Sequence, residues 1–137
     1  MMSHKINIVV PMAGAGSRFA IAGYKAPKPF IDVKGKMMIE RVLDNLSYPG
    51  ANFILIAREE HLVNCSEAIE DIQSRFPVSF ILINALTHGA ACTVLAAHRL
   101  INSDTPLLIA NSDQIVDMNL SDYIEDCFSR KLDGSIL

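Results

Sequence analysis

The stretch that decides the fold is KINIVVPMAGAGSRF, residues 5–19. Its apolar half, residues 5–11, predicts a β-strand, and the glycines that follow predict a tight loop. Gly14 and Gly16 let a ligand come close to the backbone, whose N–H groups point into a loop of this kind. A strand that leads into such a loop is one way of holding phosphate groups.

Two cations accompany this loop. Arg18 lies just after the second glycine, and its guanidinium can grip phosphate oxygens with two parallel donors. Lys28 stands between Pro27 and Pro29, whose rings restrict the backbone that carries the ammonium group. The spacing therefore predicts that both side chains contact a polyphosphate.

Two familiar nucleotide-binding motifs do not match the loop. In the dinucleotide-binding fingerprint the sixth position counted from Gly14 is glycine or alanine, whereas this chain has Phe19 there. The Walker loop requires G-K-[ST] at its end, and that triplet does not follow Gly16. What remains is G-x-G-x-R followed by a lysine between two prolines.

The rest of the chain alternates strand-like and helical patterns. Strands are predicted at residues 5–11, 52–57, 78–83 and 106–110, with a fifth opening at 134–137, and helices at 38–46, 62–76, 89–101 and 120–128. The helix 89–101 is apolar nearly all round, which predicts burial, and Asn119 or Ser121 is the predicted N-cap of the last helix. Continuously apolar strands between helices predict a three-layer α/β fold, a mostly parallel Rossmann-like sheet with helices on both faces. The unfinished fifth strand suggests the N-terminal part of a longer protein.

Composition limits the class of protein. The chain has 137 residues, which predicts one domain over 1–137, and half of them are apolar. The net charge of −3 argues against nucleic acid as a partner, and no apolar run approaches the roughly 20 residues that span a membrane. Without a signal peptide, Cys65, Cys92 and Cys127 predict reduced, packed thiols in a cytoplasmic protein. The apolar helices allow a homo-oligomer but do not require one.

Polar side chains follow three of the predicted strands. In open α/β sheets the ligand lies beyond the carboxyl ends of the strands, here the loops 12–30, 84–89 and 111–117. The stretch LLIANSD, residues 107–113, ends a strand in the carboxylate of Asp113. Mg²⁺ takes one or two carboxylates together with phosphate oxygens and water, so Asp113 is a candidate metal ligand. The alternative is an ordinary turn residue.

Thr87, His88 and Gly89 precede the predicted helix 89–101. A glycine at this turn lets a flat base lie on the backbone, and an ordinary helix start with Thr87 as N-cap is the alternative. A hydrolytic triad of Ser17, His88 and Asp113 has no support, because the chain lacks a G-x-S-x-G elbow.

Taken together, these segments resemble one family. PMAGAGSRF and KAPKPFIDVKGKMMIERVLDNL, residues 11–19 and 25–46, resemble the signature of the sugar-phosphate nucleotidyltransferase superfamily. HGAACTVLAAHRLI and LLIANSD, residues 88–101 and 107–113, look like its G-[TA]-A-x-x-[LV]-x-A segment and its strand ending in a metal-binding aspartate. The segments come in the family's order and cover almost the whole chain.

The resemblance implies an activity. Members transfer a nucleoside monophosphate from an NTP to a phosphorylated acceptor, a sugar 1-phosphate first of all, and release pyrophosphate. It implies that Arg18 and Lys28 are the catalytic cations on the triphosphate and that Asp113 binds Mg²⁺. Other implied nucleotide contacts are Met12, Ala13, Gly14, Ala15, Gly16, Ser17, His88, Gly89 and Asn111.

The resemblance is not complete. The family's second metal carboxylate and its acceptor-binding half come from later strands, and Met37 replaces the proline of V-x-G-K-P. We therefore expect an incomplete nucleotidyltransferase domain, which limits the activity of this chain alone. One alternative is a non-sugar acceptor: an alcohol phosphate, phosphocholine or a phosphorylated amino acid. Others are a non-catalytic nucleotide-binding or regulatory module and, more distantly, a dinucleotide oxidoreductase.

Overall fold

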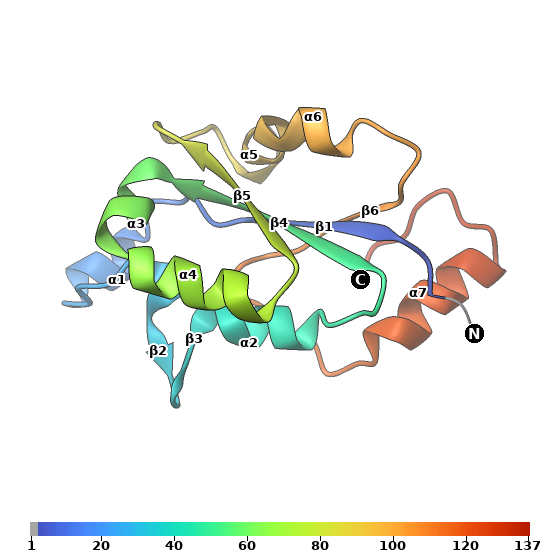
Figure 1. The fold of residues 1–137 in the computed structure, drawn as a ribbon, viewed down its shortest axis with the longest axis horizontal. Coiled ribbons are helices and arrows are strands. Elements are labelled where there is room, and N and C mark those ends of the chain that lie inside the picture. The colour runs from blue at the N-terminus through green and yellow to red at the C-terminus, as the bar shows by residue number, and fades with distance from the viewer. Residues whose placement is uncertain (1–2) are drawn as a thin grey trace.

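The computed structural model describes residues 3–137. Within them, four strands form one sheet, in the order β5-β4-β1-β6 (Figure 1). The strands are β1 (Ile6–Pro11), β4 (Ala51–Arg58), β5 (Val78–Ile83) and β6 (Leu107–Ile109). Every neighbouring pair is parallel, so the carboxyl ends of all four strands share one edge of the sheet. The predicted parallel sheet is confirmed.

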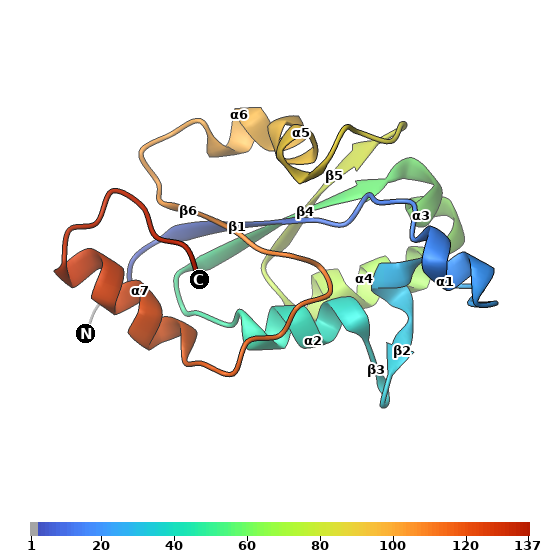
Figure 2. The ribbon, with the colours of Figure 1, turned by 180° about the vertical axis from the view of Figure 1, so that it is seen from behind.

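Helices cover both faces of this sheet (Figures 1 and 2). Along β1, Ile8 and Val10 pack on one face against α2 (Met38–Asn45), α4 (Ser66–Arg75) and α7 (Leu120–Ser129). Val9 points to the opposite face and packs with Val94 and Ala97. That face carries α5 (Ala90–Val94), η2 (Leu95–Ala97) and α6 (His98–Ile101). The alternation of side chains along a strand thus divides the core into two layers, and the predicted three-layer fold is confirmed.

Two helix predictions were wrong in detail. The segment 62–76 is not one helix, because α3 (Glu59–Asn64) ends before Cys65, whose φ of −133° breaks the helical path to α4. The segment 89–101 is divided among α5, η2 and α6 and is not buried all round. Only the side that faces the sheet is covered, and Leu95 is 66% exposed. An apolar sequence cannot bury a face that no other element covers.

Other corrections concern short segments. The expected strand 134–137 is irregular, because no strand of residues 3–137 pairs with it. Cys92 is exposed rather than packed. The expected loop 12–30 contains α1 (Ser17–Ile21) and η1 (Lys28–Phe30), and a hairpin of β2 (Asp32–Val33) and β3 (Lys36–Met37) follows it. The predicted cap Asn119 is confirmed, since its side chain accepts the N–H of Asp122 at 3.2 Å.

The start of the described chain is held in place. The His4 ring stacks on Phe128 of α7 with centroids 3.7 Å apart, and the His4 N–H donates to the Tyr48 hydroxyl at 3.0 Å. Gly50 lies so close that a Cβ there would overlap the His4 carbonyl group. No helix of residues 3–137 is both long enough and apolar enough to cross a membrane.

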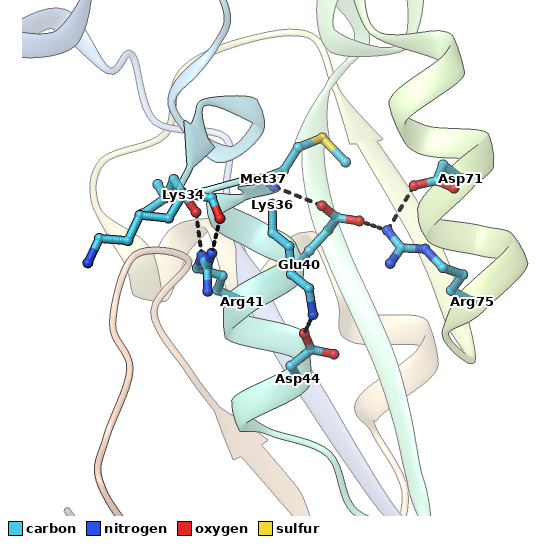
Figure 3. Close-up of polar contacts among 9 residues, drawn as sticks. Lys34, Lys36, Met37, Glu40, Arg41, Asp44, Asp71 and Arg75 are labelled. Carbon is cyan, nitrogen blue, oxygen red and sulfur yellow. Dashed lines mark hydrogen bonds and ion pairs between the residues drawn. The ribbon is translucent and has the colours of Figure 1, made fainter.

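Glu40 joins three elements on one side of the sheet (Figure 3). Its carboxylate, 7% exposed, accepts the Met37 N–H at 2.8 Å and forms an ion pair with Arg75 at the end of α4. Arg75 also pairs with the exposed Asp71 at 2.8 Å. Nearby, the Arg41 guanidinium donates to the carbonyl of Val33 at 2.6 Å and holds the hairpin on α2. These contacts fix where α2 begins.

Removing the Glu40 carboxylate would leave the Met37 N–H without its partner. We expect Glu40→Ala to lower the free energy of unfolding by about 2–3 kcal/mol, the scale of hydrogen bonds to a charged group. The matched change Asp71→Ala removes only the exposed partner of Arg75, which is worth about 0–1 kcal/mol. Urea unfolding followed by circular dichroism compares the variants, and equal losses would contradict this ranking.

Candidate functional site

The glycine loop begins where β1 ends. The Met12 N–H donates to the Ile56 carbonyl of β4 at 2.9 Å, which fixes the exit of the chain from the sheet. Gly16 then takes a left-handed conformation with a φ of 59°, and its carbonyl accepts the N–H of Phe19 at 3.0 Å as α1 starts. A Cβ on Gly16 would lie 3.3 Å from the Lys28 Cβ. Both the backbone angle and the close packing therefore favour glycine at this position.

A cavity of about 380 Å³ opens at the carboxyl ends of the strands, beside this loop. The three loops that the sequence analysis singled out meet around it. We call it the front cavity; its lining residues are Pro11, Met12, Ala13, Gly14, Ala15, Gly16, Ser17, Arg18, Phe19, Lys28, Pro29, Leu86, Thr87, Gly89, Ala90, Thr93, Asn111, Ser112 and Asp113.

With one exception, the predicted site residues are all in this lining. The exception is His88, which is exposed, so its contact with a base stays a prediction. Arg18 is exposed on α1, and its guanidinium has no ion-pair or hydrogen-bond partner within the described chain. It is available to a ligand without giving up a contact.

Lys28 and Asp113 form an ion pair across the front cavity. Lys28 comes from η1 and Asp113 from the loop after β6, and the two are 85 residues apart in sequence. The Lys28 ammonium also lies 5.5 Å from the centre of the Phe19 ring. The side chains are 24% and 41% exposed, respectively, so a ligand can reach both. The predicted phosphate-binding cation and the predicted metal ligand thus neutralise each other in this structure.

The loop that carries Asp113 is held by a residue that the sequence analysis did not select. Asn45, on α2, accepts the Val116 N–H at 3.0 Å and donates to the Val116 carbonyl at 2.9 Å. Within the loop, the Asn111 amide donates to Gln114 at 2.8 Å. Asn45 lies in the polar stripe of a predicted helix, and nothing in its local sequence indicates a partner 71 residues away.

Two threonines shape the far end of the front cavity. Thr93 is 6% exposed, and its hydroxyl donates to the Gly89 carbonyl at 3.2 Å and also contacts the Thr87 hydroxyl. The alternative in which Thr87 is a helix N-cap is wrong, because Gly89 is the N-cap of α5 and no side chain caps that helix. The φ of Gly89, 93°, is a value that favours glycine. At this turn Thr87, Gly89 and Ala90 line the cavity.

The donor set around Asp113 suits one kind of metal site. No cluster of three or more His, Cys, Asp or Glu side chains occurs in residues 3–137. Within residues 3–137, a metal held in the front cavity would therefore have Asp113 as its one carboxylate ligand. Mg²⁺ fits this donor set, since it binds through one or two carboxylates and keeps water and substrate phosphate oxygens as its other ligands.

Several solved structures share this fold. A glucose-1-phosphate thymidylyltransferase from Bacillus anthracis, so described provisionally, is 18% identical with a TM-score of 0.74, and the match covers 92% of this chain and 51% of that one. A nucleoside-diphosphate-sugar pyrophosphorylase from Vibrio cholerae is 26% identical with a TM-score of 0.63, covering 85% and 52%. The inositol-1-phosphate CTP transferase of T. maritima is 17% identical with a TM-score of 0.66, covering 83% and 45%.

This chain therefore spans about half the length of these proteins. No curated protein sequence matches it. The sequence model of the nucleotidyl transferase family, in contrast, matches residues 8–137. Because this match covers nearly the whole chain, the protein belongs to the nucleotidyl transferase family.

Proposed function

We propose that the chain is the nucleotide-binding part of an enzyme that transfers a nucleoside monophosphate from an NTP to a phosphorylated acceptor. The observation that carries this proposal is the front cavity, where a glycine loop with two cations faces the carboxylate of Asp113. Solved structures with this fold bear names that specify glucose 1-phosphate and inositol 1-phosphate as acceptors. A sugar 1-phosphate is the first choice of acceptor and an alcohol phosphate the second. The free cysteines suit the reducing cytoplasm.

The reaction needs charge and position more than proton transfer. An oxygen of the acceptor phosphate is already a nucleophile. It attacks the α-phosphorus, and pyrophosphate leaves with the electron pair of the broken P–O bond. Arg18, Lys28 and the loop amides offset the charge that moves onto the departing oxygens. Asp113, with Asn111 and Ser112 beside it, would hold Mg²⁺, which supplies further charge on the phosphates when bound. Holding the acceptor phosphate in line with the α-phosphate also lowers the barrier, because the reacting atoms are already positioned.

We further propose that Lys28 and Asp113 change partners when a nucleotide binds. In the ion pair each neutralises the other, so neither Lys28 nor Asp113 is an isolated charge in the ligand-free site. A triphosphate with Mg²⁺ offers an anion to Lys28 and a cation to Asp113 at the same time. Separating the pair then costs little, because both charges are matched again.

A second function has one observation in its favour. Among the described residues, Asp113 is the only acidic one that lines the front cavity. A non-catalytic module that binds nucleotides would need no more than this. Such a module binds NTP with little dependence on Mg²⁺, and Asp113→Ala leaves its affinity unchanged.

Calorimetric titration with ATP, GTP, CTP, UTP and dTTP in Mg²⁺ tests the proposal and identifies the base. We expect Arg18→Ala or Lys28→Ala to weaken binding of the preferred NTP by about 1.5–3 kcal/mol, the value of a hydrogen bond to a charged group. Arg99→Ala is the matched control, because Arg99 is exposed on α6 and lies outside the front cavity. Absence of binding for all five nucleotides, or unchanged binding in both loop variants, would overturn the assignment.

The exchange of partners predicts opposite effects of one substitution. Without metal, Asp113→Asn frees Lys28 and removes a repelling carboxylate, so inorganic pyrophosphate should bind about tenfold more tightly in EDTA. With Mg²⁺ the same variant should bind NTP more weakly. Asp117→Asn, on the same loop but outside the cavity lining, is the control and should change neither value. Weaker pyrophosphate binding by Asp113→Asn in EDTA would contradict the exchange.

A further inference from the structure

A second cavity of about 310 Å³ lies on the other side of the glycine loop. Gly14 and Gly16 form the wall that it shares with the front cavity. Its other walls come from the segment before η1, which includes Lys25, and from the end of β4 with the start of α3, which includes Arg58 and His61. We call this space the rear cavity. It is large enough for a small metabolite.

We propose that the rear cavity binds a small phosphate ester that carries hydroxyl groups, at a site separate from the nucleotide. This site goes beyond the proposed transfer reaction, because the glycine loop separates it from the nucleotide in the front cavity. Its ligand class follows from two features of the lining, one a surplus of positive charge and the other a buried imidazole without a partner.

The positive charge of the rear cavity comes from Lys25, Lys28 and Arg58, which outnumber the single carboxylate of Glu60. Arg58 pairs with Glu60 at 3.1 Å, and Lys28 is held by Asp113 on the front side. Lys25 has no ion-pair partner anywhere in residues 3–137. One positive charge is therefore unbalanced in a concave space. The remaining N–H groups of Arg58 add donors beside it, and phosphate is the anion that such a set of donors fits.

The imidazole belongs to His61. The residue is 3% exposed, lies edge-on to the Phe30 ring at 5.8 Å, and its Nδ1 has no hydrogen-bond partner within the described chain. Burial lowers the pKa of His61, an effect that Glu60 opposes and Arg58 reinforces, and this shift favours the neutral ring. A neutral ring offers one donor and one acceptor. Because His61 lines the rear cavity, a hydroxyl group or a water bound with it can supply the hydrogen bond that the imidazole lacks.

The shared wall connects the two sites. A phosphate ester in the rear cavity contacts residues 14–16 from the side opposite the nucleotide. It also contacts Lys28, which lines the front cavity as well. Occupancy of the rear cavity therefore changes the affinity for the nucleotide, and by linkage the nucleotide changes the affinity for the ester by the same factor.

Titration with glycerol 3-phosphate, followed by ¹H–¹⁵N NMR without nucleotide, tests the rear cavity independently of the transfer reaction. We expect the amide signals of residues 24–26 and 58–64 to move together with those of residues 14–16. Lys25 is exposed, so Lys25→Ala should fold normally, and it should weaken binding about tenfold. Lys25→Arg should restore most of the affinity, while Arg18→Ala and the surface control Lys5→Ala should leave it unchanged.

Three results would overturn the proposal. The first is that the amides of residues 58–64 do not respond. The second is that Lys25→Ala binds glycerol 3-phosphate as well as the unaltered protein does. The third is a response limited to residues 86–93 and 111–113 that disappears in Arg18→Ala, which would place the probe in the front cavity.

Discussion

The structure depends on the position of β1 at the centre of the sheet. This strand is hydrogen-bonded in parallel to β4 on one edge and to β6 on the other, and Ile8, Val9 and Val10 are fully buried. A strand fixed on both edges and both faces has one direction and one register. Its carboxyl end therefore delivers the glycine loop next to the loop after β6. The front cavity and the Lys28–Asp113 pair both follow from this placement.

The sheet and its large helices could be predicted because the strands are continuous apolar runs and the helices repeat their apolar residues at helical spacing. The β2–β3 hairpin and α1 were not predicted, since segments of two to five residues are too short to show a period. Residues 89–101 and Cys92 are less buried than their apolar sequence predicts. Burial depends on what packs against a face, and the apolar residues of a single segment do not contain that information.

In the candidate site, too, some features could be predicted from the sequence and others could not. Arg18, Lys28 and Asp113 could be selected from sequence because each follows a recognisable strand or loop motif. The contacts that set their geometry could not, since they join residues far apart in the chain, as Asn45 does with Val116 and Lys28 with Asp113. The rear cavity was missed for a related reason. Lys25, Arg58 and His61 belong to separate segments and form a site only where the fold brings them behind the glycine loop.

The anchoring of His4 has a practical consequence. His4 is held by the Tyr48 hydroxyl, the Phe128 ring and the close approach of Gly50, so the beginning of the described chain supports the packing of α7. An affinity tag therefore needs a spacer before residue 3, and a version trimmed past His4 would lose the stacking partner of the last helix. For recombinant work, His4 is part of the folded body.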